Sequence, residues 1–327
     1  MSSCGPAKPV SESNQDTSTR DKVTSVSLSE PSNLSISVCS FNIKFVGLYK
    51  KKDHTALADL LKAYDLVLIQ ELVSPPVDGV FPDGSAYSAD PEARAFVDAM
   101  TNNGFKYVLS DEDTGTNEEI HSNSSSTEWF IAFYDTTHLS VDDELFNEFL
   151  AADRSNHPSY ERVPFAFSFK TKDRGLDFTL ISVHLNPGSG TSDKNRRKEE
   201  LTTITQWINN HNSVEKDFLI VGDMNIYSQE ELMSVLPAGY KSLNEACIPT
   251  NIASSGKPYD HVMYNPTYSG TEVDSTFEIL DLIEMMRPYW TDSTTPYPGN
   301  DLNLFYQYYS DHKPVVFNMV SYGTDDD

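Results

Sequence analysis

The chain is poor in cysteine, in basic residues and in long apolar runs. It contains three cysteines, Cys4, Cys39 and Cys247, among 327 residues. So small and odd a number argues against a disulfide framework. Cys39 lies within an apolar run, so we expect it to be a small buried hydrophobic residue. No apolar stretch approaches the roughly 18 residues that a membrane-spanning helix requires.

The scarcity of basic residues bears on the substrate. The 24 Lys and Arg residues are outnumbered by 49 Asp and Glu residues, which gives a formal net charge of −25. A protein that binds DNA by neutralising phosphates needs a basic face, and the whole-chain charge shows no sign of one. The acidic surface is compatible with a secreted protein kept soluble by charge, with local neutralisation by bound cations, or with a substrate other than nucleic acid.

The first residues are rich in Ser, Thr and Pro. Cys4 lies in the segment Ser2-Ser3-Cys4-Gly5, which resembles the point at which a bacterial lipoprotein is processed and lipidated. A plain disordered tail is the alternative. We therefore predict a disordered tail or tether over 1–33, one folded domain over 34–322 and an acidic tail over 323–327. A lipid anchor at Cys4 would place the protein outside the cell, in the periplasm or on the outer surface.

Short apolar runs alternate with helical patterns along the rest of the chain. Continuous apolar or alternating runs predict strands, and apolar residues at helical spacing or capping residues predict helices. This mixture favours layered α/β packing in a single domain. The predicted strands are Leu34–Phe41, Leu66–Ile69, Trp129–Tyr134, Phe165–Phe169, Phe178–Val183, Phe218–Val221 and Val315–Val320. The predicted helices are His54–Tyr64, Pro91–Met100, Asp193–Asn210 and one that starts at a capping box, Ser228 to Glu231.

Two segments between these elements stand out. Residues 111–127 are acidic and rich in Ser, and residues 285–309 are rich in Tyr and Pro. Loop statistics favour irregular surface excursions for both. The alternative for the second segment is that it walls a substrate groove, because it runs directly into Ser310.

Polar residues suited to binding metal or moving protons flank the apolar runs. Ligand sites in α/β proteins gather at strand ends, so these side chains could converge on one place. Taken singly, each is more often a cap, a turn or a structural residue; six in order beside strands are a stronger signal. The six segments are Ser40-Phe41-Asn42, Gln70-Glu71, His184-Leu185-Asn186, Gly222-Asp223-Met224-Asn225, Tyr259-Asp260-His261 and Ser310-Asp311-His312.

These residue types fit one kind of chemistry. Carboxylates with an amide oxygen form a hard oxygen site, which suits Mg²⁺, Mn²⁺ or Ca²⁺. Such an ion polarises a phosphoryl oxygen. Two histidines can take a proton from water and give one to a leaving oxygen, and each needs an acid to orient it. Asp260 and Glu128 are available for that role.

The order of these motifs resembles the endonuclease/exonuclease/phosphatase superfamily over nearly all of residues 38–320. The strongest matches are Ser310-Asp311-His312 with Pro314-Val315, and Gly222-Asp223-Met224-Asn225, which has Met224 where phenylalanine is commoner. Ser40-Phe41-Asn42-Ile43 and Ile69-Gln70-Glu71 match the N-terminal motifs. The resemblance implies a four-layered α/β sandwich with two central mixed β-sheets.

The resemblance also implies roles for individual residues. Glu71, Asn42, Asp223, Asn225 and Asp311 would form the metal and phosphate cluster, with Mg²⁺ as the expected ion and Mn²⁺ or Ca²⁺ as alternatives. His312 with Asp260 would be the general base, and His184 with Glu128 the general acid, although the two histidines could exchange roles. Arg162, in Arg162-Val163-Pro164-Phe165, would bind a substrate phosphate.

The two histidines, with Glu128 and Arg162, resemble the deoxyribonuclease I-like branch more than the repair exonucleases. The segment Lys257-Pro258-Tyr259-Asp260-His261 differs from the motif of the inositol phosphatases. The expected function is therefore a DNA endonuclease that leaves 5′-phosphate ends and acts as a monomer without an obligate protein partner. One alternative is a sphingomyelinase-like phospholipid phosphodiesterase, which also has two histidines. The other is an inactive binding module. His261 departs from the family pattern, because an arginine is common there.

Overall fold

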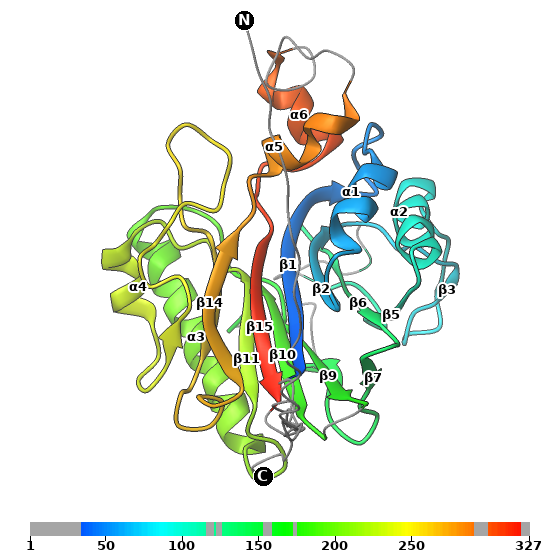
Figure 1. Ribbon diagram of the computed structural model, residues 1–327. Coiled ribbons are helices and arrows are strands. Elements are labelled where there is room, and N and C mark those ends of the chain that lie inside the picture. Colours follow the sequence, from blue (N-terminus) through cyan, green and yellow to red (C-terminus); the bar gives the residue numbers. More distant parts are fainter. Residues whose placement is uncertain are drawn as a thin grey trace, which may run out of the picture. The chain divides into compact units, whose positions relative to one another are not determined.

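Two mixed β-sheets packed against each other form the centre of the fold (Figure 1). The computed structural model describes residues 34–115, 121, 126–152, 159–172, 175–290 and 300–321. Contacts group the described residues into one compact unit. The predicted tails, 1–33 with Cys4 and 323–327, lie outside the described residues.

The first sheet has six strands among the described residues, and β1 lies near its middle. β1 is parallel to β2 and antiparallel to β15. The other neighbouring strands of this sheet are antiparallel. In spatial order the strands are β14 (Val273–Ile279), β15 (Val315–Ser321), β1 (Leu34–Val46), β2 (Leu66–Leu72), β6 (Trp129–Asp135) and β5 (Phe105–Leu109).

The second sheet has seven strands in the described part of the chain. β10 and β11 run parallel, and the remaining pairs are antiparallel. Its order is β12 (Lys241–Ser242), β13 (Asp260–Tyr264), β11 (Phe218–Asp223), β10 (Asp177–His184), β9 (Phe165–Thr171) and β7 (Leu139–Val141), and β8 (Asn147–Phe149) pairs with β9. β3 (Gly79–Val80) and β4 (Ala86–Tyr87) form a separate small hairpin.

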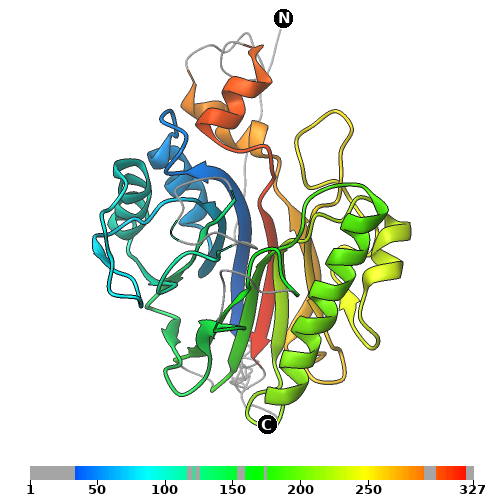
Figure 2. The same cartoon turned by 180° about the vertical axis from the view of Figure 1, so that it is seen from behind.

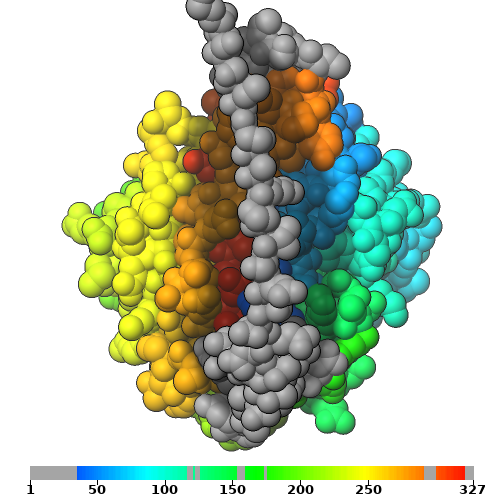
Figure 3. All heavy atoms as spheres, in the orientation of Figure 1, coloured from blue at the N-terminus to red at the C-terminus, as the bar shows by residue number. Residues whose placement is uncertain are grey.

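Helices cover the outer faces of both sheets. α1 (His54–Leu61) and α2 (Pro91–Asn102) lie on the first sheet, and α3 (Thr191–His211) and α4 (Gln229–Val235) lie on the second (Figures 1 and 2). In the space-filling view, yellow to yellow-green residues lie on one side of the orange, red and blue residues and cyan residues lie on the other (Figure 3). In the described part of the chain, no helix is both long enough and apolar enough to cross a bilayer.

Side-chain alternation along the strands produces these layers. In β1, Ile36 and Val38 belong to the core between the sheets, whereas Phe41 and Ile43 belong to the core beneath α1 and α2. Successive strand residues face opposite sides, so one strand serves two cores. A third core lies between the second sheet and α3 and α4. The predicted four-layered sandwich is confirmed, and Cys39 is fully buried as expected.

The predicted strands and helices are confirmed, with one correction to the start of α4. Ser228 caps the helix by accepting a hydrogen bond from the Glu231 N–H at 3.2 Å. The Glu231 carboxylate does not close a capping box, because it accepts from the Tyr227 N–H and from the Arg197 guanidinium. The sequence pattern could not show that a buried arginine from α3 competes for this carboxylate.

A second correction concerns residues 285–309, because the described part of this segment is mostly helical and not an irregular excursion. Its described residues include the end of α5 (Leu282–Met286), a short 3₁₀ helix (Arg287–Tyr289) and α6 (Leu302–Tyr308). Phe305 and Tyr309 are buried in the core beneath α1 and α2. Part of the other unusual segment, 111–127, lies outside the described residues.

Gly222 supplies a stability test of the close packing between β10 and β11. Its φ is +140°, and a Cβ at this position would lie 2.2 Å from the Val183 carbonyl oxygen. We predict that Gly222→Ala lowers the free energy of unfolding in urea by about 3 kcal/mol. Gly239→Ala is the control, because its φ is +86° but the nearest atom is 3.8 Å away; it should lose about 1 kcal/mol. Equal losses would rule out the steric explanation.

Candidate active site

Strand register brings three of the predicted site residues side by side. In the second sheet, His184 at the end of β10 pairs with Asp223 at the end of β11, and Asp223 pairs with Asp260 at the start of β13. From the first sheet, Asn42 in β1 and Glu71 in β2 approach the same edge, and Asn42 donates to Asp223 across the two sheets at 3.0 Å. The site therefore lies where the two sheets meet.

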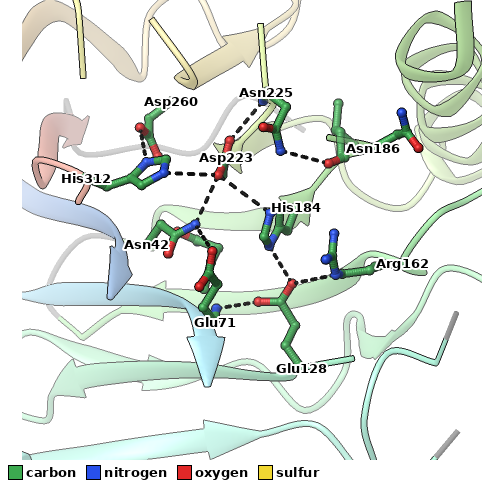
Figure 4. Close-up of polar contacts among 12 residues, drawn as sticks. Asn42, Glu71, Glu128, Arg162, His184, Asn186, Asp223, Asn225, Asp260 and His312 are labelled. Carbon is green, nitrogen blue, oxygen red and sulfur yellow. Dashed lines mark hydrogen bonds and ion pairs between the residues drawn. The ribbon is translucent and has the colours of Figure 1, made fainter. Parts of the chain in front are cut away.

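Asp223 is the centre of the polar network (Figure 4). Its Oδ2 accepts from Asn42 Nδ2 at 3.0 Å and lies 3.6 Å from the Nε2 atoms of both His184 and His312. Its Oδ1 accepts from the Asn225 backbone N–H at 2.9 Å. One carboxylate thus faces an amide and two imidazoles, in a position that is 2% exposed.

His184 is held by Glu128. Its Nδ1 lies 2.8 Å from Glu128 Oε1, and Glu128 also accepts from the Glu71 backbone N–H. Burial and the nearby Arg162 both lower the pKa of His184, but Glu128 and Asp223 outweigh them and the net shift is upward. Burial alone would raise the pKa of Glu128, yet His184 and Arg162 hold it below its ordinary value.

His312 is held in the same way by Asp260. Its Nδ1 lies 2.9 Å from Asp260 Oδ2, which also accepts from the Thr250 hydroxyl at 2.5 Å. Burial disfavours the charged imidazole, but Asp260 and Asp223 outweigh it and raise the pKa of His312 to about 10. The causes that act on His312 include no cation, which distinguishes it from His184.

Two carboxylates accept hydrogen bonds from Asn42, and a third, Asp311, lies on the segment that is bonded to its carbonyl. Asn42 Nδ2 lies 2.9 Å from Glu71 Oε1 and 3.0 Å from Asp223 Oδ2. Ser310 donates to the Asn42 carbonyl at 2.6 Å and so ties β1 to the segment that carries Asp311. Asp311 Oδ2 pairs with Lys44 Nζ at 2.9 Å. Its Oδ1 is buried and has no hydrogen-bond partner among the described residues.

The donor set fits a divalent cation. Glu71, Asp223 and Asp311 provide carboxylate oxygens, and Asn42 provides an amide oxygen, the ligand types that Mg²⁺ and Mn²⁺ prefer. A buried carboxylate oxygen without a partner, such as Asp311 Oδ1, is costly unless a cation or another donor satisfies it. Asp223 already faces both histidines, so Glu71 and Asp311 are the residues that would hold the ion.

A tighter acidic group lies away from this edge. Donor atoms of Asp65, Asp135 and His138 lie within 4.8 Å of one another. Two of these residues bond directly to each other, because His138 Nδ1 lies 2.6 Å from Asp65 Oδ1. The other Asp65 oxygen accepts twice from Ser37. These hydrogen bonds join a loop to β1, and they explain why the three side chains lie close together without requiring a bound ion.

Arg162 and Asn225 lie on opposite sides of the histidine at the end of β10. Arg162 Nε is 3.5 Å from Glu128 Oε1, and Asn225 donates to the Leu185 carbonyl at 3.0 Å. Every predicted site residue except Asp311 therefore lies in one group joined by hydrogen bonds and ion pairs, with Arg162 next to Glu128 (Figure 4). Asp311 joins the group through Lys44, which pairs with its carboxylate and whose backbone N–H donates to Asn42 Oδ1 at 3.2 Å.

Helix α3 fixes the loop that follows His184, a feature that the sequence analysis did not identify. Glu200 accepts from the backbone N–H groups of Glu161 and Asn186, at 2.8 and 2.9 Å. Arg197 donates to the carbonyls of Asn186 and Gly188, at 2.7 and 2.8 Å. Glu200 and Arg197 are fully buried. A buried Arg and Glu within a helical pattern is the signal that could have pointed to them.

Backbone strain is concentrated in the same region. Glu71, Asn225, Lys44 and Phe45 have φ values of 64°, 50°, 60° and 51°. Residues other than glycine rarely adopt these values, which cost about 1–3 kcal/mol each and cluster at functional sites. His261 does not enter the site. It is buried against the Ser242 hydroxyl at 2.8 Å, and burial lowers its pKa to about 4.

Comparisons with known proteins identify the fold. No family model and no curated protein matches the sequence, but solved structures match over most of the chain. An endonuclease/exonuclease/phosphatase family protein from Bacteroides thetaiotaomicron is 14% identical with a TM-score of 0.52, and the match covers 88% of this chain and 98% of that one.

Two further structures have similar scores. The human Nocturnin catalytic domain, with a bound sulfate anion, is 15% identical with a TM-score of 0.52, over 87% of this chain and 94% of that one. A mannosyl-6-phosphatase from Bacteroides thetaiotaomicron is 14% identical with a TM-score of 0.52, over 87% and 99%. At these identities the similarity is one of fold, and it agrees with the four-layered sandwich that the sequence predicts.

Replacing Glu128 tests the electrostatics of the His184 pair without any assay of activity. Glu128→Gln removes the negative charge that stabilises the His184 imidazolium, so we expect the pKa of His184 to fall by about one unit or more. His312, whose partner is Asp260, should titrate as before. Histidine side-chain NMR titration measures both. A His184 pKa that stays unchanged would contradict the pairing.

Proposed function

We propose that the protein is a divalent-metal-dependent phosphodiesterase and that its substrate is DNA. The observation that carries this proposal is the arrangement of the two histidines. Both Nε2 atoms lie 3.6 Å from the same Asp223 oxygen, while the Nδ1 atoms bond to different carboxylates, Glu128 and Asp260. Two imidazoles oriented toward one point suit proton transfer on both sides of a reacting phosphorus.

The remaining residues have roles that follow from their chemistry. A divalent cation at Glu71 and Asp311 would supply charge stabilisation at a phosphoryl oxygen. Arg162 is placed to bind a non-bridging phosphate oxygen, as a guanidinium does well, and Asn225 to bind another. Water attack on phosphorus with departure of the 3′ oxygen leaves a 5′-phosphate end, and each proton transfer falls to one histidine.

The surroundings of the two histidines favour opposite proton roles. Arg162 disfavours the charged form of His184, whereas His312 is affected by three carboxylates and its pKa is raised to about 10. We therefore infer that His312 donates the proton to the leaving oxygen and that His184 receives the proton from water. This inference exchanges the two roles that the sequence analysis preferred.

DNA is the preferred substrate because the two-histidine site resembles the deoxyribonuclease I-like branch. A phospholipid phosphodiesterase is the second candidate, and the partial exposure of Met285 and Tyr289, at 45% and 40%, favours it as a contact with lipid. The fold also occurs in a mannosyl-6-phosphatase, so a phosphomonoester belongs in the substrate panel. An inactive binding module is disfavoured, because every predicted site residue lies within the connected group. The lipid anchor at Cys4 and a location outside the cell stay predictions.

Cleavage of supercoiled plasmid tests the function and the site together. Purified protein should nick the plasmid with Mg²⁺ or Mn²⁺ present and lose this activity in EDTA. His184→Ala and His312→Ala should each reduce the rate about 10²–10⁴-fold, the range for loss of a general acid or base. His138→Ala, in a histidine–carboxylate pair outside the site, is the control and should keep the wild-type rate.

Hydrolysis of sphingomyelin vesicles and of a sugar phosphate should be assayed with the same protein preparations. Turnover of the vesicles without plasmid cleavage would replace DNA by a phospholipid as the substrate, and turnover of the sugar phosphate alone would indicate a phosphomonoesterase. Wild-type rates in both histidine variants would contradict the site itself.

The pH dependence tests the proposed proton roles. Arg162→Met removes a charge that lowers the pKa of His184, so that pKa should rise. Because the base must be unprotonated, the acidic limb of the kcat/KM profile should move to higher pH by about one unit. Arg94→Met, which removes an equal charge from an exposed pair with Asp78, should leave the limb in place. A limb that does not move would exclude His184 as the base.

A further inference from the structure

Lys44 occupies an unusual position at the edge of the candidate metal site. The pairing of β1 with β2 is regular up to Asn42 and shifts register between Asn42 and Val46. Within this irregularity Lys44 and Phe45 have φ values of 60° and 51°. This strained part of β1 places the Lys44 ammonium next to Asp311, which is distant in sequence, and the Phe45 N–H next to Glu71 Oε2 at 3.2 Å.

Lys44 already neutralises one of the carboxylates that would hold the ion. Its Nζ lies 2.9 Å from Asp311 Oδ2, and the two side chains are 20% and 26% exposed. The ammonium therefore occupies one of the two carboxylates that the donor chemistry assigns to the divalent cation.

The neighbouring Lys52 has a structural role and does not contact these carboxylates through a hydrogen bond. Its buried ammonium donates to the carbonyl oxygens of Ile43 at 2.6 Å and Tyr306 at 3.3 Å, and to that of Tyr309. These bonds join β1 to the end of α6. Lys52 contacts backbone carbonyls, whereas Lys44 contacts a carboxylate that is assigned to the metal ion. Of these two lysines, Lys44 is therefore the one that a bound cation would approach.

We propose that the Lys44 ammonium competes with the divalent cation for Asp311 and thereby weakens the affinity of the site for the metal. This inference rests on the proposed function, because it takes Glu71 and Asp311 as the ligands. A divalent cation at Asp311 Oδ1 and the ammonium at Asp311 Oδ2 would lie only a few ångströms apart, and like charges at that separation repel each other in a partly buried site. Binding of the ion displaces the ammonium toward the solvent that Lys44 already reaches.

The competition predicts that removing the lysine charge tightens metal binding. We expect Lys44→Met to lower the Kd for Mn²⁺ about tenfold in calorimetric titration of the full chain. Lys44→Arg keeps the charge and should keep the weaker affinity. Lys50→Met is the matched control, because it removes one ammonium from the same segment, where Lys50 pairs with Asp90 at 58% side-chain exposure; its affinity should equal that of the wild type.

Thermal unfolding provides a second measurement. Without Mn²⁺ the Lys44→Met protein should melt below the wild type, because Asp311 loses its partner. A fixed Mn²⁺ concentration should then raise its Tm by more than that of the wild type, as tighter binding to the folded state requires. If Lys44→Met does not fold, Lys44→Gln, which retains a polar end, replaces it in both experiments.

The outcomes separate this inference from the proposed site. Glu71→Gln and Asp311→Asn should each weaken Mn²⁺ binding; if both bind as the wild type does, the metal site itself is wrong. If they lose binding while Lys44→Met binds Mn²⁺ no more tightly than the wild type, the site stands and the competition is refuted. Equal tightening in Lys50→Met would also refute it, because the effect would then come from overall charge.

Discussion

The Asp223 carboxylate is the constraint on which the rest of the site depends. It is buried at the end of β11, and one of its oxygens is approached by Asn42 from the other sheet and by both histidines. A buried carboxylate is stable only when donors or positive charges satisfy it. The strands, the strained residues Glu71 and Asn225 and the segment before β15 therefore have to bring these partners to one point. The partners that satisfy the Asp223 carboxylate include both histidines, and these are the groups that the proposed proton transfers require.

Much of the fold and the site could be predicted from the sequence, because both have local signals. Apolar runs such as Leu66–Ile69 require a strand buried on both faces, and polar residues just beyond such runs fall at the sheet edge by geometry. His184, Asp223 and Asp260 meet because their strands are neighbours in register. The helix at residues 302–308 was missed, since its aromatic residues serve a core that the chain reaches only in three dimensions.

The features that escaped prediction depend on contacts between distant residues. Glu231 looks like a capping residue in sequence, but it is the partner of Arg197, 34 positions away. Arg197 and Glu200 lie on a polar helix, and only the fold shows that they form hydrogen bonds with the loop after His184. Lys44 and Asp311 form an ion pair although most of the sequence of the folded domain lies between them. The pattern and spacing of residues carry no information about such pairs. Once the structure is known, each pair is explained by the need of a charge shielded from water for an opposite charge.

The most direct test of the account is a crystal structure of the protein soaked with Mn²⁺ and phosphate, with the ion located by its anomalous signal. The account predicts the ion at the carboxylates of Glu71 and Asp311, and the phosphate between the two histidines, in contact with Asn225 and within reach of Arg162. An ion bound instead at Asp65, Asp135 and His138, with no phosphate beside Asp223, would contradict it.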